Sequence, residues 1–433
     1  MSTTTIAETP HSKLVSRAHR IEEWAEKHLV DPRGIIYTYL DVATGKPPTD
    51  DFFTSDQAPL CAPICTPSEW HSYENTGQAT SEYMLGLLYQ YTVEKDPAVL
   101  TRIQRSYQAL KYVYNSGSTV EEGFLPKMYG NRISVETSTD QVLYVMLAFD
   151  YYHQYASSSE KVDIDRMIVG LTRFWTNRNY RYRYFWMEDM EWPISRFPCL
   201  LLMAYRHSGD EAFKAEYDRL LEMKVNERPF ESQLQPKLRG ECPPTPYEKA
   251  HHAWLIGEVD GAVGMEVAQY DYLLSNDPGH PLAESWKKAM KIIWDDGTLV
   301  VAPDGTGYVH VLVDMDTLKP RRPEPEFHAE ANPNPKNSME AWIGWRHVTG
   351  GRTCDVTFIA RSGVQVYKHI RDPEIIKVSQ KILKAIDVEN MISYMDPERY
   401  LPELRHRNNL LSGDGTAHWL WAYWLGRSEG VIS

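Results

Sequence analysis

Apolar and aromatic residues recur along this chain at helical spacing, in stretches that are separated by short polar turns. Five such turns follow an apolar stretch, at Asp96-Pro97, Ser159, Asp210, Asp277 and Asp372. Proline is tolerated in the first turn of a helix but not in its interior, so a proline after a turn marks a new helix. Recurrence at intervals of roughly 50 to 95 residues is typical of a repeated helical hairpin. The pattern therefore predicts an array of paired helices.

Twelve helices fit this pattern, as six pairs. The first helix of each pair alternates apolar and charged positions, and these helices are expected at Lys13–Leu29, Ala98–Asn115, Val162–Thr176, Glu211–Met223, Pro281–Trp294 and Pro373–Ile386. The second helix carries few charges, and these helices are expected at Gly77–Glu94, Ser138–Gln154, Pro193–His207, Gly261–Leu274, Asp355–His369 and Gly415–Leu425. Helices that are apolar all round are buried, and amphipathic helices cover them. We therefore predict an all-α fold, an (α/α)6 toroid of six helical hairpins that forms one domain over residues 1–433.

Two segments interrupt the helical pattern, residues 30–76 and residues 295–350. The second contains the stretches TLVVAPDG and GYVHVLVDMD, whose alternating apolar positions around Asp304-Gly305 predict a small β-hairpin insertion. Long connections inside a compact domain are often functional. Both segments precede inner helices, so we interpret them as walls of a cleft, with a plain surface excursion as the alternative.

Composition and net charge limit the classes of molecule that the protein is expected to bind. The 433 residues carry a net charge of −13, which disfavours nucleic-acid binding because that function normally needs a basic excess. The chain also contains 13 Trp and 27 Tyr, which suit either a large core or a cleft in which aromatic rings stack on sugars. Composition alone favours the core. We expect an oligosaccharide as the partner only on the strength of the site residues below.

Neither cysteines nor apolar runs indicate a disulfide framework, a metal site or a membrane span. The five cysteines are scattered, and Cys61 and Cys65 lack the second ligand pair of a structural zinc site. Adjacent side chains diverge, so His251 and His252 do not predict a metal site either. The first residues contain no apolar signal core, and no apolar run is long enough to cross a membrane. We expect a cytoplasmic protein without metal or cofactor.

The starts of the six inner helices are expected to meet around one rim, which we call the mouth. Free backbone N–H groups and the helix dipole favour carboxylates and anionic ligands there. The segments before these helices read WHSYENTGQ, VETSTDQ, WMEDMEWP, HHAWLIGEVDG, GGRTCDVTF and LSGDGTAHW. An acid at a helix start is most often a cap, and that alternative explains Asp140 or Asp414 taken singly. Caps do not need Trp and His beside them, so the convergence favours a site.

Hydrolysis of a glycosidic bond requires two carboxyl groups, one of which is commonly buried beside aromatic rings so that it stays protonated. The cluster Glu188, Asp189 and Glu191 lies between Trp186 and Trp192, and could supply the buried acid. A second carboxylate could come from another inner-helix start. The candidate catalytic residues are Asp140, Asp189, Glu191 and Asp260.

Histidines and arginines near the mouth leave other chemistry open. His71, His251, His252 and His418 could move protons at neutral pH, paired for epimerisation of a sugar, or with Tyr73 for β-elimination beside a uronate. A buried structural histidine is the alternative for each. Arg196, Arg352 and Arg361 could bind a substrate carboxylate or form ordinary ion pairs. The candidate substrate-binding residues are His71, Tyr73, Glu74, Trp192, His252, Trp254, Arg352, Arg361, His418 and Trp419.

The stretch STDQVLYVMLAFDYYH, with Asp140 at the start of an inner helix, and the turn HSGDEAF resemble the (α/α)6-barrel unsaturated glucuronyl hydrolases and related glucuronidases. The resemblance implies hydrolysis of an oligosaccharide, with one that contains a uronic acid as the narrower expectation, and Asp140 is the residue carried over. The second acid of that group has no clear match here. N-acylglucosamine 2-epimerase-like enzymes and toroid polysaccharide lyases share the fold, so epimerisation and lysis stay as alternatives. A non-enzymatic scaffold is disfavoured because the predicted rim is polar and acidic.

Overall fold

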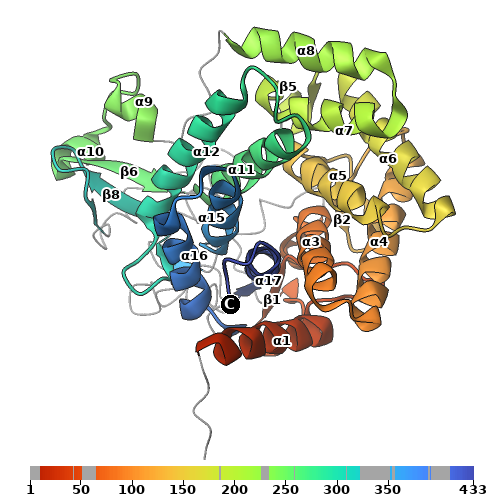
Figure 1. The fold of residues 1–433 in the computed structure, drawn as a ribbon, viewed down its shortest axis with the longest axis horizontal. Coiled ribbons are helices and arrows are strands. Elements are labelled where there is room, and N and C mark those ends of the chain that lie inside the picture. The colour runs from red at the N-terminus through yellow and green to blue at the C-terminus, as the bar shows by residue number, and fades with distance from the viewer. Residues whose placement is uncertain are drawn as a thin grey trace, which may run out of the picture.

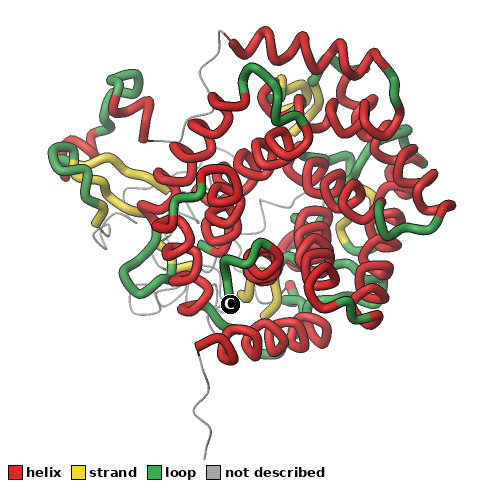
Figure 2. Tube along the Cα trace, viewed as in Figure 1, coloured by secondary structure: helices red, strands yellow, loops and turns green. Residues whose placement is uncertain are grey.

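The computed structural model describes residues 10–41, 43–50, 65–184, 187–225, 234–257, 259–308, 310–321, 352–353, 356–388, 391 and 410–433. Helices dominate these ranges and form two concentric layers around one axis (Figures 1 and 2). The predicted all-α toroid is therefore confirmed. No described helix combines the length and the apolar character that crossing a membrane requires.

Each of the twelve predicted helices is present. The outer layer consists of α1 (Pro10–His28), α4 (Pro97–Ser118), α6 (Ser158–Thr176), α8 (Glu211–Val225), α12 (Ala283–Gly297) and α16 (Pro373–Ala385). The inner layer consists of α3 (Thr76–Glu94), α5 (Thr139–His153), α7 (Pro198–Ser208), α11 (Val259–Asn276), α15 (Thr357–Ile370) and α17 (Gly413–Ser428). Figure 1 shows the inner helices arranged as a ring.

Side-chain caps begin three of the outer helices, α4, α6 and α16, at or beside turns that the sequence marks. Asp96 accepts a hydrogen bond from the backbone N–H of Ala98 at 2.8 Å, and Pro97 follows as the first helical residue. Asp372 caps α16 in the same way. Ser157 opens α6 with a reciprocal capping box to Glu160. Each cap satisfies backbone N–H groups that a helix start leaves without a partner.

The ring closes where the first and last inner helices meet. Helix α17 packs between α3 and α15. The close approach depends on Gly86, because a Cβ atom there would lie only 3.1 Å from the backbone nitrogen of Trp421. Strand β1 (Tyr39–Asp41) also pairs antiparallel with β11 (Leu410–Ser412), just before α17. The two ends of the helical array are therefore tied together by packing and by backbone hydrogen bonds.

The third inner helix begins later than predicted, at Pro198 instead of Pro193. Strand β4 (Arg181–Tyr184) pairs antiparallel with β5 (Met187–Glu191), and the one-turn helix η3 (Ile194–Arg196) follows. Helical spacing does not extend into this segment, because its side chains alternate between the two faces of a hairpin. Prolines 193 and 198 then separate the hairpin, η3 and α7.

The prediction of a hairpin around Asp304-Gly305 is wrong, because its expected first strand does not form. Its first arm forms the one-turn helix η4 (Thr298–Val300), and a single bridge joins Val301 to Gly307. The hairpin that does form joins β8 (His310–Asp314) to β9 (Pro320–Arg321). On its other edge β8 pairs with β6 (Ala253–Gly257), an apolar strand far away in the sequence. Residues 322–350 of the predicted insertion lie outside the described residues.

Shorter elements surround these layers. They are α2 (Pro67–Tyr73), β2 (Met128–Tyr129), β3 (Arg132–Ile133), α9 (Leu234–Leu238), α10 (Pro246–His251), β7 (Gly307–Tyr308) and β10 (Arg352–Thr353). Of these, α2 directly precedes α3 and so belongs to the mouth. In Figure 1, α9, α10, β6 and β8 project outward beside α12 and α15.

Candidate active site

Asp140 stands at the mouth, as the second residue of α5. The N-cap of this helix is Ser138, so the alternative that Asp140 is the cap is wrong. The Asp140 side chain is partly exposed, and no described residue forms a hydrogen bond or an ion pair with its carboxylate. Helix α5 therefore fixes the position of this half-buried carboxylate, but no described hydrogen bond or ion pair of the fold depends on it.

A buried lysine provides positive charge beside Asp140. Lys127 forms an ion pair with Glu74, the residue that ends α2. Burial disfavours the charged form of Lys127, but Glu74 and then Tyr184 and Asp140 outweigh burial and raise its pKa. Burial also raises the pKa of the Tyr184 phenol to about 12, so that phenol stays neutral at physiological pH. The charge of Asp140 therefore acts on both the Lys127 ammonium and the Tyr184 phenol.

Arg196 brings a second cation to the start of α5. Its guanidinium donates a hydrogen bond to Thr139 Oγ1 at 2.8 Å and lies 5.7 Å from the centre of the Trp192 ring. Among the described residues no carboxylate pairs with it. Because η3 carries Arg196 directly against α5, a ligand carboxylate at the mouth would meet this guanidinium.

A polar layer lies one to two turns below the mouth, where five inner helices each contribute a residue: Glu82, Tyr144, Gly264, Arg361 and His418. Arg361 Nη2 donates to Tyr144 Oη at 3.1 Å and to the Gly264 carbonyl at 2.7 Å. Its Nε donates to His418 Nδ1 at 3.3 Å. His418 Nε2 in turn lies 2.7 Å from Glu82 Oε1. The layer joins the inner helices across the axis.

Burial and charge fix the protonation states in this layer. Burial, with help from Arg361, lowers the pKa of His418 well below its usual value. Neutral His418 accepts from Arg361 at Nδ1, so its proton lies on Nε2 and points to Glu82. Burial, and then the charge of Asp414, raise the pKa of Glu82. Arg361, His418 and Glu82 therefore use their polar atoms in contacts with one another.

Gly264 makes room for the Arg361 guanidinium. A Cβ atom at this position would lie 2.6 Å from Phe358 Cδ1 and 3.1 Å from Arg361 Nη2. Both distances are shorter than ordinary contacts between such atoms. A glycine in the second turn of α11 is therefore required by close packing.

The predicted binding residues of α2 lie near the mouth with different exposure. His71 is buried against the rings of Trp70 and Tyr39, with ring centres 4.9 and 5.9 Å away. Tyr73 is half-buried, 5.4 Å from the ring of Tyr37. Glu74 is already paired with Lys127. The guanidinium of Arg33 lies 5.3 Å from the centre of the Tyr73 ring, so this ring also has a charged neighbour.

The expected burial of Asp189 and Glu191 is wrong. Both lie on β5 with side chains 66% and 64% exposed, and both pair with Arg181 of β4. The hydrogen bonds from Arg181 lower the pKa of Asp189. Trp192, by contrast, is buried against Trp175. The hairpin turns these acids outward, so they do not provide the buried acid that hydrolysis requires.

Three further predicted residues, His252, Trp254 and Trp419, do not join the Asp140 group. His252 is 62% exposed and lies 2.9 Å from Asp316 in the projecting sheet region, and the half-buried Trp254 lies near Lys237. Trp419 donates a hydrogen bond to the Leu383 carbonyl of α16 at 3.3 Å, so it packs between the two helical layers. Asp260 and Arg352 begin α11 and β10, but their side chains lie outside the described residues.

Comparison with known proteins supports the fold and leaves the reaction open. No family model matches the sequence, and no curated protein matches it significantly. The fold is similar to an unsaturated glucuronyl hydrolase specific for heparin, with a TM-score of 0.52, 9% identity, and coverage of 97% of this chain and 98% of the other. A polysaccharide lyase (TM-score 0.51, 12% identity, 98% of each chain) and a sugar epimerase from a ruminal bacterium (0.51, 9%, 96% and 98%) are also similar.

These three solved structures have one architecture and three chemistries. At such identities the likeness shows the fold alone, and the choice of reaction must rest on the residues of the site. The resemblance expected from the Asp140 stretch is thereby confirmed at the level of architecture. The protein has the (α/α)6 toroid fold that these three structures share.

Proposed function

We propose that the protein is a glycoside hydrolase that cleaves an oligosaccharide at the mouth, with Asp140 as the carboxylate that acts at the scissile bond. The observation that carries the proposal is the state of this side chain. It is partly exposed at an inner-helix start, and no described residue binds it. The nearby ion pair of Lys127 and Glu74 makes the surroundings of Asp140 polar, and the charges of Lys127 and Asp140 interact.

We assign the second carboxyl group of the pair to Asp414. It occupies the second position of α17, as Asp140 does in α5, and α17 adjoins α3. The side-chain amide of Asn75 donates to Asp414 Oδ2 at 3.2 Å, which holds the carboxyl group at the rim. The Asp414 side chain is almost fully buried. Asp140 then acts as base or nucleophile and Asp414 as acid.

The substrate class follows from Arg196. Among the described residues, the Arg196 guanidinium is hydrogen-bonded to Thr139 alone and lies 5.7 Å from the centre of the Trp192 ring, so it retains N–H donors for an incoming carboxylate. Guanidinium and carboxylate form paired, charge-assisted hydrogen bonds. We therefore propose an oligosaccharide that carries a uronic acid, with the sugar carboxylate on Arg196.

Epimerisation by paired histidines receives less support from the geometry. His418 is fully buried, with Arg361 on one ring nitrogen and Glu82 on the other. His252 lies on the projecting sheet region and pairs with Asp316. General acid–base catalysis requires a histidine within reach of substrate, and neither residue meets this requirement.

Product analysis tests the proposed reaction. Uronate-bearing oligosaccharides and their neutral counterparts are incubated with the protein, and the products are separated and analysed by mass. Hydrolysis adds one water across the cleaved bond and creates a new reducing end. An unsaturated, ultraviolet-absorbing uronate would show a lyase instead, and an isomer of unchanged mass would show an epimerase. Either of those products, or no turnover of any substrate, contradicts the proposal.

A further inference from the structure

Three side chains that can bind a metal converge at the end of the toroid opposite the mouth, which we call the rear. His153 is the last residue of α5, Asp165 lies in α6, and His207 lies in the last turn of α7. His207 Nδ1 is 2.7 Å from Asp165 Oδ1, and His153 Nε2 is 3.2 Å from the same oxygen. All three ligand atoms lie within 4.8 Å of one another. Three helices therefore direct two imidazoles and one carboxylate to a single point.

The spacing of these atoms suits a tetrahedral ion. Zinc binds imidazole nitrogen and carboxylate oxygen at about 2.0–2.1 Å, which places neighbouring ligand atoms roughly 3.3 Å apart. The two printed separations from Asp165 Oδ1, 2.7 Å to His207 Nδ1 and 3.2 Å to His153 Nε2, are close to that value. Small rotations of the two imidazoles would bring the three atoms around an ion, without movement of a helix.

A second carboxylate already orients the His207 ring for this role. His207 Nε2 lies 2.8 Å from Asp150 Oδ1, so Nδ1 is the nitrogen that faces the cluster. Asp150 is itself held by Arg206 at 2.9 Å and by the Tyr272 hydroxyl at 3.2 Å. A carboxylate on the far nitrogen of a metal-binding histidine fixes the ring and raises the basicity of the ligand. The site therefore has a histidine ligand whose ring is already oriented by a second carboxylate, a feature that a simple cluster of acidic residues lacks.

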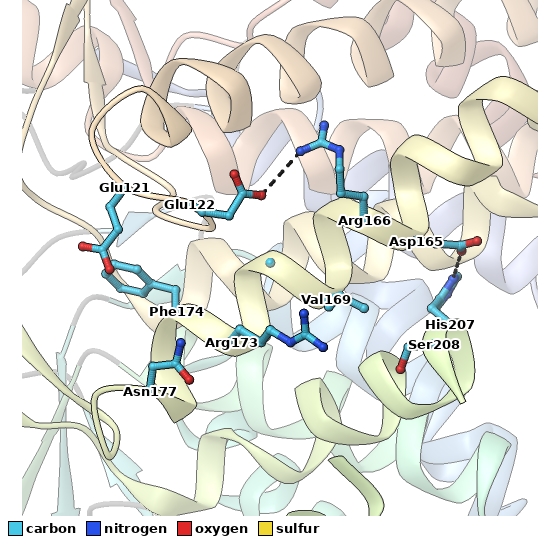
Figure 3. A pocket seen from close by; sticks show the side chains of 11 residues that line it. Glu121, Glu122, Asp165, Arg166, Val169, Arg173, Phe174, Asn177, His207 and Ser208 are labelled. Atoms are coloured by element: carbon cyan, nitrogen blue, oxygen red, sulfur yellow. Dashed lines mark hydrogen bonds and ion pairs between the residues drawn. The ribbon is translucent and has the colours of Figure 1, made fainter. Parts of the chain in front are cut away.

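The cluster opens on a cavity. A hollow of about 410 Å³ is lined by Asp165, His207 and Ser208 at one end and by Arg166 and Arg173 farther along (Figure 3). Figure 3 shows the Asp165 and His207 side chains meeting at one end of this hollow. Water can therefore reach a fourth coordination position, while the three protein ligands occupy the others.

We propose that His153, Asp165 and His207 form a binding site for a divalent transition-metal ion such as Zn2+, with water from the cavity as the fourth ligand. Two imidazoles favour zinc and related metals over magnesium or calcium, which prefer oxygen ligands. The ion would take the place of the proton between His207 and Asp165, and would link α5, α6 and α7 at the rear. The site is independent of the proposed hydrolase chemistry at the mouth.

Metal titration of chelator-treated protein tests the site. We expect Zn2+ and Co2+ to bind at one equivalent per chain by calorimetry, with a rise in thermal midpoint that Mg2+ and Ca2+ do not produce. Bound Co2+ should show the visible absorption of a four- or five-coordinate ion with nitrogen and oxygen ligands. Absence of stoichiometric binding by both metals would overturn the proposal.

Three variants locate the bound ion. His153→Gln removes one ligand but leaves the contact between Asp150 and His207 intact, and should weaken binding more than tenfold. Asp150→Asn, which keeps all three ligands, should weaken it about 10- to 100-fold. The matched control is His19→Gln, because His19 also lies beside two acids, Glu22 and Glu94, but belongs to no cluster of three metal ligands among the described residues. Equal affinity in wild type and His153→Gln, or a loss in His19→Gln alone, would place the ion elsewhere and overturn the assignment.

Discussion

Charged residues at the mouth and at the rear of the toroid differ in whether described residues bind them. At the rear, Asp271 of α11 binds Lys368 at 2.9 Å and His369 at 2.7 Å, and Asp150 binds Arg206 and His207. At the mouth, Asp140 has neither a hydrogen bond nor an ion pair with any described residue. Arg196, also at the mouth, has no carboxylate partner in the described ranges either.

This difference separates the groups that hold the fold from the groups that await a ligand. Removing charge from water costs free energy, and pairing offsets that cost. The rear and the polar layer around Arg361 follow this rule. A half-buried acid and a half-buried arginine that do not follow it, both at the start of α5, are best explained by a substrate that completes their contacts.

Breaking the polar layer should have the largest effect on stability. Arg361→Met conserves much of the side-chain volume but leaves the Tyr144 hydroxyl and the Gly264 carbonyl without their donor. Loss of one member of a buried charged network costs about 3–5 kcal/mol. We expect that decrease in the free energy of unfolding in urea. A decrease below about 1 kcal/mol would show that the layer does not tie the inner helices together.

The rear should lose stability in acid. Burial alone would raise the pKa of Asp271, but Lys368 and His369 outweigh burial and lower it to about 2, from 3.8 in the unfolded chain. A lowered folded-state pKa stabilises the protein above the unfolded value, by about 2 kcal/mol, and this contribution is lost as pH falls from about 4 to about 2.

Unfolding of wild type and Asp271→Asn, followed in urea from pH 6 to pH 3, measures this contribution. The gap between the two proteins should be constant down to about pH 5 and should shrink by about 1 kcal/mol at pH 3. The acids that the two proteins share act equally on both and cancel in the difference. A gap that does not depend on pH would show that Asp271 is not stabilised as an ion.

Substitution at the mouth should affect activity and spare stability. Arg196→Met removes the guanidinium, and we expect kcat/KM for a uronate-bearing substrate to fall about 10- to 100-fold, the worth of a charge-assisted hydrogen bond. Turnover of a neutral counterpart and the thermal midpoint should change little. An equal loss on both substrates would assign Arg196 to the structure of the mouth and not to the substrate carboxylate.

The smallest effect on activity and stability is expected from a substitution in the exposed hairpin of β4 and β5. Asp189→Asn removes one partner of Arg181 on β4, and Glu191 remains beside the same guanidinium. Exposed ion pairs contribute little to stability. Both kcat/KM and the thermal midpoint should match wild type within error. Loss of turnover would return Asp189 to the catalytic candidates and weaken the contrast between the two ends.

Local signals account for what the sequence predicted well. The capped starts at Asp96 and Asp372 and the apolar period locate the helices, because a helix depends on residues three and four positions apart. The hairpin of β4 and β5 and the sheet of β6 and β8 were missed, because the partner of a strand is set by tertiary packing. Outward rotation of Asp189 follows from the same hairpin.

The sites show the same limit. Asp140 was found because an acid at an inner-helix start is visible in the sequence. Glu82 had a weaker signal, as a single charge within an apolar inner helix. No signal in the sequence indicated the rear cluster, because His207 is 42 residues from Asp165 and 57 residues from Asp150. Only the ring of helices brings these side chains together.

Turnover by Asp140→Asn tests the central claim most directly. The substitution keeps the size of the side chain and removes its charge, in a residue that no described hydrogen bond requires. We predict that kcat falls by about 10²- to 10⁴-fold on the oligosaccharide that wild type hydrolyses, while the thermal midpoint stays unchanged. Wild-type turnover by a folded Asp140→Asn protein would contradict the account, because the charged residue that the mouth leaves without a partner would then have no part in the reaction.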